Sequence, residues 1–231
     1  MKTEKFAVIG VGHFGKAIAL TLSKKGAEVM CIDINNEIID SISDEVSYAV
    51  ALDATDKKAL ISQDIKDFDA VVVSIGQNFE KRLLCAAVLL DIGVKRIICR
   101  SLGKSQRLIL EKMGITEILS PEDEIAIIVA ERLLNPSIVS YLQLPDDYRI
   151  AEVIAPRKIA GRTLGDIDIR DKYKLSLITI KREFQEMVDN KKCYIQHIIG
   201  VPDSKTIVQP KDNLVLFGKT RDLDRFIEIN Q

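Results

Sequence analysis

The sequence has no excess of charge of either sign. Its 231 residues include 33 lysines and arginines and 34 aspartates and glutamates, which gives a formal net charge of −1. A protein that binds nucleic acid through its overall charge normally carries a basic excess, so we expect no nucleic-acid partner. The hydrophobic fraction of 47% is ordinary for a globular chain with a proper core.

Long hydrophobic runs are also missing. No stretch approaches the roughly 18 uninterrupted apolar residues of a membrane-spanning helix. The N-terminal residues MKTEKFAVIGVG contain neither the apolar segment nor the small-residue cleavage site of a signal peptide. We therefore expect a cytoplasmic protein that does not cross a membrane itself but can still dock on a membrane protein.

Cysteines are few and widely spaced. Cys31, Cys85, Cys99 and Cys193 form no CxxC motif, and the closely paired ligands of a structural zinc site are absent. Cys31 and Cys99 fall in strand-like runs, and Cys85 falls in a helix-like run. We therefore expect buried, reduced thiols rather than disulfides.

Short apolar runs alternate with helical patterns through the first half of the chain. Strands of this kind, continuous and apolar, are typical of a parallel sheet that helices cover on both faces. Six of them predict a doubly wound, Rossmann-type α/β domain. The expected strands are 5–10, 28–32, 47–52, 69–75, 96–99 and 116–119, and the expected helices are 16–25, 37–42, 57–61, 79–90 and 106–113.

The pattern changes in the second half of the chain. Pro121 and the acidic residues after it favour a helix start, with an apolar helix at 125–134 and a second helical piece at 137–142. A smaller α+β domain follows, for which we predict strands at 149–155, 175–181 and 214–218 and helices at 162–173 and 220–229. The predicted domains are 1–120, a connecting helix and linker at 121–144, and 145–231.

A glycine-rich motif follows the first expected strand and opens the first expected helix. In this GxGxxG pattern Gly10 allows a tight turn, Gly12 lets the backbone approach a pyrophosphate, and Gly15 lets the helix pack close to the strand. The helix N-terminus then presents N–H groups to the phosphates. A plain tight turn is the alternative interpretation. The residues of the motif are Gly10, Val11, Gly12, His13, Phe14 and Gly15.

An acidic residue ends the second expected strand. Asp33 lies 18 positions after Gly15, where a carboxylate accepts hydrogen bonds from ribose hydroxyls and repels the 2′-phosphate of NADP. Residues that follow the third and fourth strands should reach the same ligand, although Thr55 or Asp56 can also cap the next helix. These further candidates are Asp53, Ala54, Thr55, Ser74, Ile75, Gly76 and Asn78.

Groups for acid–base catalysis are scarce. The histidines are His13, inside the phosphate loop, and His197, which we expect on the surface or on an edge strand. A dehydrogenase needs a proton donor or acceptor that faces the nicotinamide, and neither histidine fits that role. We therefore expect a nucleotide-binding protein that is not an enzyme. The alternatives are a small NAD-dependent oxidoreductase and a transcriptional redox sensor, although we find no helix-turn-helix module for the latter.

The order and spacing of the motifs resemble a known family across essentially the whole chain. The chain is similar to the KtrA/TrkA-type regulatory subunits of bacterial potassium uptake systems, which are built from RCK domains. The motifs that carry the resemblance are VIGVGHFG (8–15), DIN (33–35), ALDATD (51–56), VVVSIGQN (71–78), LEKMGITEILSPE (110–122), LGDIDIRDKYKLSLITIKR (164–182) and PKDNLVLFG (210–218).

The resemblance implies ligands and partners. It implies ATP, ADP, NAD or NADH at the Rossmann site, with Ile34 of the DIN motif among the contacts, and a Mg, Ca or Na ion near Glu122. It also implies cyclic di-AMP at Ile169 and Arg170, and dimers of the C-terminal domain. Pairs formed through the helix after Pro121 would assemble into an octameric ring at the inner face of the membrane, beneath a potassium channel or transporter pore subunit. A regulator of a cation antiporter is a further alternative.

One position departs from the family pattern. Family members that sense ATP often carry arginine where this chain has His13, and histidine cannot make the forked, permanently charged phosphate contact of arginine. Arg100, at the end of the fifth expected strand, is a candidate substitute cation. Because histidine titrates near neutrality, His13 also predicts stronger phosphate binding at acidic pH.

Overall fold

A computed structural model describes residues 3–76, 78–188 and 191–231, and the chain falls into two units, residues 1–124 and 125–231. Each unit has its own sheet and its own core. Helix α6 (Pro121–Leu134) begins in the first unit and ends in the second. The other elements of the first unit are β1 (Lys5–Ile9), α1 (His13–Lys24), β2 (Glu28–Asp33), α2 (Asn36–Asp40), η1 (Ser43–Glu45), β3 (Tyr48–Ala51), α3 (Lys57–Ile61), η2 (Ile65–Asp67), β4 (Ala70–Val73), α4 (Phe79–Ile92), β5 (Ile97–Arg100), α5 (Gly103–Lys112) and β6 (Glu117–Leu119).

The sheet of the first unit is parallel throughout its described strands, in the order β3-β2-β1-β4-β5-β6. Val8 in β1 lies in register with Cys31 of β2 and with Val72 of β4. All residues of β4 are buried, which explains why its sequence is a continuous apolar run. The predicted doubly wound sheet is confirmed, and its strand order reverses between β1 and β4.

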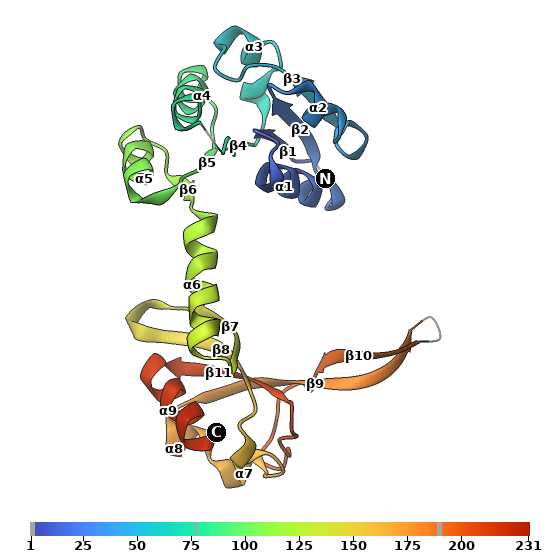
Figure 1. Ribbon diagram of the computed structural model, residues 1–231, viewed down its shortest axis with the longest axis vertical. Helices are drawn as coiled ribbons and strands as arrows, with labels where there is room; N and C mark the ends of the chain where they lie inside the picture. The colour runs from blue at the N-terminus through green and yellow to red at the C-terminus, as the bar shows by residue number, and fades with distance from the viewer. Residues whose placement is uncertain (1–2, 77, 189–190) are drawn as a thin grey trace. The chain divides into compact units, whose positions relative to one another are not determined.

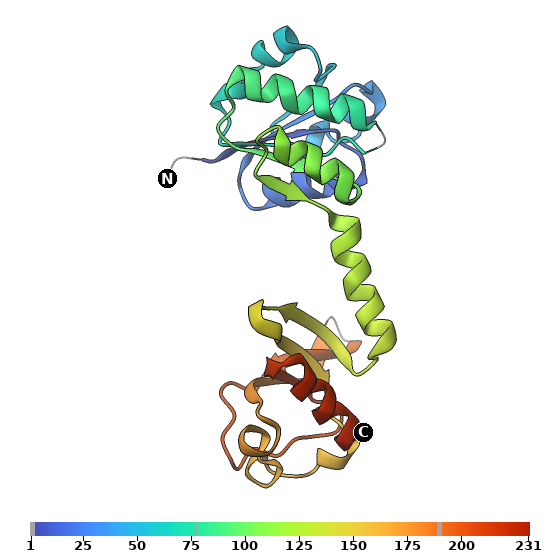
Figure 2. The same ribbon diagram turned by 90° about the vertical axis from the view of Figure 1, so that its left-hand side faces the viewer.

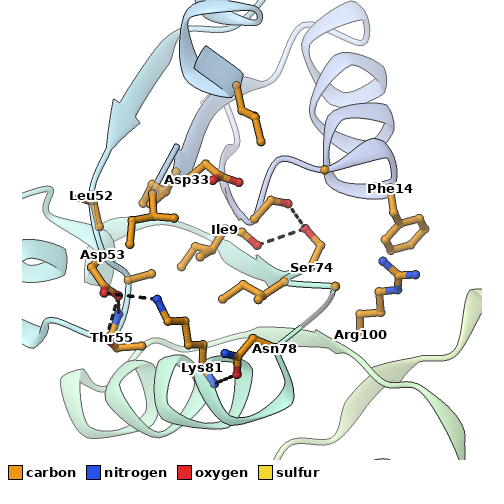
Figure 3. A pocket seen from close by; sticks show the side chains of 18 of the residues that line it. Ile9, Phe14, Asp33, Leu52, Asp53, Thr55, Ser74, Asn78, Lys81 and Arg100 are labelled. Carbon is orange, nitrogen blue, oxygen red and sulfur yellow. Dashed lines mark hydrogen bonds and ion pairs between the residues drawn. The ribbon is translucent and has the colours of Figure 1, made fainter. Parts of the chain in front are cut away.

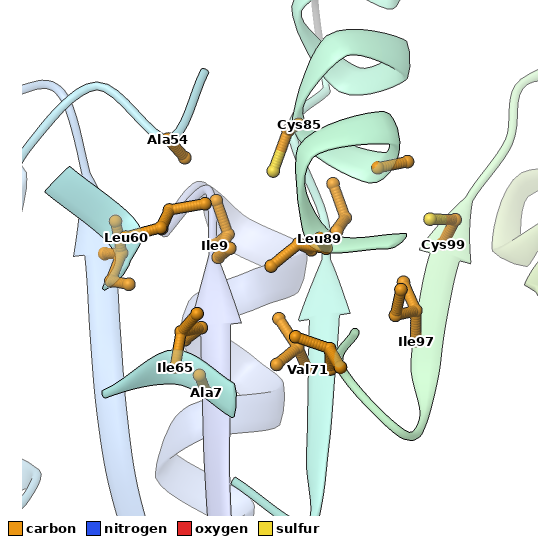
Figure 4. Packing of buried hydrophobic residues seen from close by; sticks show 14 of the residues in the cluster. Ala7, Ile9, Ala54, Leu60, Ile65, Val71, Cys85, Leu89, Ile97 and Cys99 are labelled. Carbon is orange, nitrogen blue, oxygen red and sulfur yellow. The ribbon is translucent and has the colours of Figure 1, made fainter. Parts of the chain in front are cut away.

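Helices cover both faces of this sheet (Figures 1 and 2). On one face Ala19 of α1 and Ile39 of α2 pack with residues of β1 and β2. On the other face Leu60 of α3, Cys85 of α4 and Leu110 of α5 join the larger core cluster. Figure 4 shows Cys85 and Leu89 of α4 facing the sheet residues of this cluster.

The cysteines of the first unit lie in these two cores. Cys31, Cys85 and Cys99 are buried free thiols, as predicted, whereas Cys193 of the second unit is half-buried. Burial raises the pKa of Cys31 to about 11 and that of Cys99 to about 12, and it raises the pKa of Cys85 further. These side chains are therefore protonated packing groups at neutral pH.

Polar residues at the strand ends begin the following helices. The side chains of Asn35, Asp56 and Asn78 accept hydrogen bonds from backbone N–H groups in the first turns of α2, α3 and α4. The predicted cap of α3 is thus Asp56, which leaves Asp53 free of that role. Gly114 follows the end of α5 in a left-handed conformation, with φ at +93°, as expected of a helix that stops at glycine.

The second unit is a five-stranded antiparallel sheet in the described residues, in the order β10-β9-β11-β8-β7. Its core includes Leu214 and Leu216 of the central strand, and Phe226 of the last helix packs edge-on against Tyr173, with ring centroids 5.0 Å apart. The elements are β7 (Ile138–Gln143), η3 (Pro145–Asp147), β8 (Tyr148–Ile154), η4 (Arg157–Ile159), α7 (Leu164–Ile167), α8 (Ile169–Tyr173), β9 (Ser176–Val188), β10 (Lys191–Ile198), β11 (Asn213–Lys219) and α9 (Thr220–Asn230).

Three expectations for the second unit were wrong in detail. The predicted helical piece at 137–142 is strand β7. A segment this short can form either a helix or a strand, and its pairing with β8 makes it a strand. The predicted helix at 162–173 is two helices, since Asp168 between them is left-handed, with φ at +54°. Strand β9 runs seven residues past the predicted end at Lys181 and pairs with β10, for which the sequence indicated only a surface or edge-strand position at His197.

Two further expectations can be compared with the structure. His197 lies on β10 at the edge of the sheet and is exposed, as predicted. Within the part of the chain that the structure describes, no helix has the length and apolarity needed to span a bilayer.

Candidate functional site

A pocket of about 660 Å³ lies at the carboxyl ends of the strands in the first unit, where the strand order reverses (Figure 3). Ligands bind at this location in open α/β sheets because the loops on either side of the reversal diverge. The lining residues are Ile9, Gly10, Gly12, His13, Phe14, Ile32, Asp33, Ile34, Ile38, Leu52, Asp53, Ala54, Thr55, Ser74, Ile75, Gly76, Asn78, Lys81 and Arg100.

The structure brings the predicted residues of the Rossmann site together, except for two that do not line the pocket. Val11 is buried in the core beneath α1. Gly15 lies behind the loop, where a Cβ atom would stand 2.1 Å from the carbonyl oxygen of Gly10 and 2.5 Å from Oγ of Ser74. Gly15 therefore permits the close approach of helix to strand that the motif predicts.

The glycine-rich loop leaves open space before α1. Gly10 has φ at +87°, and a Cβ atom on it would lie 2.7 Å from the backbone nitrogen of Ile75. Gly12, the N-cap of α1, has no atom within 4 Å of the corresponding position. Among the described residues no side chain caps α1, and its first turn has no acidic residue. Because Gly12 and His13 line the pocket, the positive end of the helix dipole faces it.

Asp33 is fixed at the end of β2 by backbone hydrogen bonds. Its Oδ2 accepts from the N–H of Val11 at 2.8 Å, and its Oδ1 accepts from the N–H of Asn35 at 3.0 Å. Each carboxylate oxygen keeps a further acceptor site. The arrangement can therefore accept hydroxyl groups of a ribose without moving, while Ile34 beside it is exposed.

A second polar group lies across the pocket. Asp53 accepts hydrogen bonds from the N–H and the hydroxyl of Thr55, at 2.9 and 2.7 Å, and these bonds lower the pKa of the Asp53 carboxyl. The ammonium group of Lys81 stands 3.9 Å from the Asp53 carboxylate (Figure 3). Ala54 lies between Asp53 and Thr55 in the same loop.

Lys81 is a lining residue that the sequence reasoning missed. Lys81 lies in the first turn of α4, and the side chain of Asn78, the N-cap of that helix, accepts from its N–H at 2.9 Å. The spacing of three residues from the predicted Asn78 is the sequence feature that could have identified Lys81. The other missed residues are apolar and lie next to predicted ones at strand ends or in α2, namely Ile9, Ile32, Ile38 and Leu52.

Arg100, the last residue of β5, pairs with a carboxylate in the first turn of α6. Its guanidinium lies 5.4 Å from the centroid of the Phe14 ring (Figure 3). It also donates to the carboxylate of Glu122. Its Nε is buried and has no hydrogen-bond partner among the described residues. Because Arg100 also lines the pocket together with Gly12 and His13 at the start of α1, its guanidinium is suited to a phosphate oxygen.

The expected metal ligand lies beside this cation. Glu122 is in the first turn of α6 and pairs with Arg100. In the described ranges no three His, Cys, Asp or Glu side chains gather into a group that could hold a metal ion. One carboxylate that is already paired with arginine is a poor metal site by itself, so a cation at Glu122 stays a prediction.

The residues predicted for cyclic di-AMP line a different pocket, in the second unit. This pocket has a volume of about 420 Å³. Its lining residues are Leu164, Gly165, Asp168, Ile169, Arg170, Leu175, Ser176, Leu177, Pro202, Asp203 and Ser204. The structure thus places Ile169 and Arg170 together at a concave surface, and their ligand stays a prediction.

The fold and the first pocket define a class: a Rossmann-type nucleotide-binding unit joined to a smaller antiparallel unit. Residues 6–121 match the TrkA-N domain and residues 148–231 match the TrkA-C domain. The chain belongs to the TrkA family of RCK-domain proteins, which confirms the resemblance drawn from its motifs.

Relatives of known name match over nearly the full length. Ktr system potassium uptake proteins C and A of Bacillus subtilis (strain 168) are 32% and 30% identical to this chain, and each match covers 98% of this chain and 96% of the relative. The solved GsuK channel bound to NAD has the same fold, with a TM-score of 0.62 and 15% identity. That match covers 99% of this chain and 39% of the GsuK chain.

Proposed function

We propose that this chain is a cytoplasmic regulatory subunit of a potassium uptake system and responds to an adenine nucleotide. The observation that carries the proposal is the full-length similarity to the Ktr system proteins of Bacillus subtilis. In this proposal residues 1–120 sense the nucleotide, 121–144 connect, and 145–231 form the second regulatory domain. The chain acts on a membrane pore subunit and catalyses no reaction of its own.

The pocket suits ADP, ATP or NAD(H). Asp33 receives the ribose hydroxyls, and its charge disfavours a 2′-phosphate. The N-terminus of α1 and Arg100 receive the phosphates, with Arg100 in place of the arginine that His13 replaces. The NAD named for the GsuK structure supports a dinucleotide as one candidate. The exposed Ile34 and the apolar Leu52 flank the space for the adenine ring.

Gating requires that the ligand favour one conformation over another. A phosphate at Arg100 competes with Glu122 for the same guanidinium, and Glu122 lies in the first turn of α6. Ligands with different phosphate charge therefore release α6 to different degrees. A difference of about 1–3 kcal/mol between the two states is typical of such coupling.

Assembly and a second ligand belong to the same proposal. The chain forms homo-oligomers that pair through α6 and build an octameric ring, and cyclic di-AMP binds at Arg170.

Equilibrium binding to the purified protein tests the ligand. We expect adenine nucleotides to bind, and Asp33→Asn to weaken ADP about tenfold or more, because a charged acceptor contributes about 1.5–3 kcal/mol. Asp44→Asn, which changes an exposed residue of η1 outside the pocket, is the matched control and should leave affinity unchanged. NADH oxidation coupled to reduction of a carbonyl compound would instead support a small oxidoreductase.

The potassium role needs a separate measurement. Cells that lack potassium uptake and express a Ktr-type pore subunit should grow at lower potassium when they also express this chain. The Asp33→Asn variant should give less of this benefit than the Asp44→Asn control. Equal growth with and without the chain would contradict the regulatory role.

A further inference from the structure

Arg82 is an unusual buried charge beside the nucleotide pocket. Its side chain is 0% exposed and is the largest of the fully buried side chains in the described residues. Its guanidinium donates to the carbonyl oxygens of Ile75 and Gly76, at 2.6 and 2.7 Å, and to the side-chain oxygen of Gln106 at 2.8 Å. All three acceptors are neutral, and none of the described ion pairs includes Arg82.

Two other arginines, the buried Arg149 and the half-buried Arg182, have charged partners. Arg149 pairs with Glu131 at 3.0 Å, and Arg182 pairs with Asp212 at 2.7 Å. Burial of a charge is costly unless an opposite charge compensates it. Burial lowers the pKa of Arg82, and the positive charge of Arg100 lowers it further, although arginine stays protonated at neutral pH.

Both cations converge on one backbone position. Gly76 lines the pocket, and its carbonyl oxygen binds Arg82. A Cβ atom on Gly76 would lie 3.5 Å from Nη1 of Arg100. Two guanidinium groups therefore stand at one end of the pocket, and Glu122 is the only carboxylate paired with either in the described structure. One positive charge is therefore left without a described carboxylate partner, and an anion in the pocket would offset it.

The hydrogen bonds of Arg82 also orient the loops that line the pocket. Because the carbonyls of Ile75 and Gly76 point to Arg82, their negative ends are turned away from a bound phosphate. The oxygen of Gln106 that binds Arg82 also accepts the N–H of Leu102 at 2.9 Å. Arg82 and Gln106 thus join the loop after β4 to the loop that follows Arg100 at the end of β5.

We propose that Arg82 is a positioning residue that makes the pocket select for phosphate charge. Without contacting the ligand, it adds positive potential behind Gly76 and holds the loop carbonyls away from the phosphates. Binding should therefore strengthen steeply from adenosine to AMP to ADP. This inference rests on the proposed nucleotide site and adds a determinant of its selectivity.

The sharpest test neutralises Arg82 in place. Gln106→Glu keeps the shape of the side chain and its bonds to Arg82 and Leu102, but it supplies the missing carboxylate. We expect thermal stability to be unchanged or raised, ADP affinity to fall about tenfold, and adenosine affinity to change less than about twofold. Gln63→Glu, the same substitution in the same unit but outside the pocket, is the matched control.

Substitution of Arg82 itself gives a second readout, the ratio of the adenosine and ADP dissociation constants. Arg82→Met should lower this ratio about tenfold, and Arg82→Lys, which keeps the charge, should lower it less. If Arg82→Met fails to fold, Gln106→Glu and Arg82→Lys still decide the question. An unchanged ratio in Gln106→Glu overturns the role of Arg82. No binding of any nucleotide by the unaltered protein overturns the proposed function instead.

Discussion

The two units of this chain differ in the partners of their buried and half-buried charged side chains. In the second unit Arg182 donates through two nitrogens to Asp212, and Glu152 accepts from Lys181, Asn213 and Ser140. In the first unit Arg82 has neutral partners only, and Arg100 keeps a buried donor without a described partner. Charge pairs of the second unit therefore stabilise its fold, whereas Arg82 and Arg100 of the first unit leave positive charge beside the pocket that an anionic ligand can offset.

Sheet topology explains this difference. In the parallel sheet the carboxyl ends of all strands lie at one edge, so polar residues that follow the strands gather around one pocket. In the antiparallel sheet neighbouring strands run in opposite directions, and charged side chains on adjacent strands can face each other. Lys181 of β9 and Glu152 of β8 pair even across the central strand β11, which lies between their two strands. Substitutions in each unit should therefore affect different properties.

The largest effect is expected in the first unit, from Gly15→Ala. The new methyl group would overlap the backbone oxygen of Gly10 and the hydroxyl of Ser74, so the loop or α1 must shift, at a cost of about 3 kcal/mol. The midpoint temperature of thermal unfolding should fall, and ADP binding should be lost. Gly12→Ala is the control, since φ there is −68° and nothing lies within 4 Å. Its stability should stay near that of the unaltered protein while ADP affinity falls.

A smaller effect is expected in the second unit, from Asp212→Asn. Asp212 is 1% exposed, and the substitution leaves the half-buried Arg182 without its charged partner, at a cost of about 2 kcal/mol. Urea unfolding measures this loss, with Asp171→Asn at an exposed position as control. Affinity for ADP should not change. If the free energy of ADP binding weakens as much as the free energy of unfolding does, the conclusion that charges in the two units affect different properties is wrong.

The smallest effect concerns pH. Burial opposes ionisation of Glu152, but hydrogen bonds from Lys181 and Asn213 outweigh it, and the pKa of Glu152 lies below its ordinary value. A lowered carboxyl pKa stabilises the fold at neutral pH, and this stabilisation is lost as the pH falls below about 4.5. Glu152→Gln should therefore cost about 1 kcal/mol at pH 7 and progressively less toward pH 3. A difference from the unaltered protein that is constant over this range would contradict the assignment.

The sequence alone was sufficient for the first unit and for most of its pocket. Continuous apolar strands, helix caps and the glycine motif are local signals, and the carboxyl ends of parallel strands necessarily share one edge. These rules alone predict that Gly12, Asp33 and Ser74 lie at a common site, and all three line the pocket. These rules did not identify Lys81, because a lysine in the first turn of a helix is ordinarily a solvated residue.

Tertiary structure decided what local signals leave open. Strand β7 is a strand because β8 pairs with it, and the sequence left open whether His197 lies on a surface loop or on the edge strand that β10 forms. Arg82 and Gln106 lie 24 positions apart, and their contact exists only because α4 and α5 pack on the same face of the sheet. The sequence by itself determined the periodicity, the turns and the loop chemistry, since each depends on neighbouring residues. The pairing of distant groups, and hence the charge left for a ligand, depends on packing and came only from the folded chain.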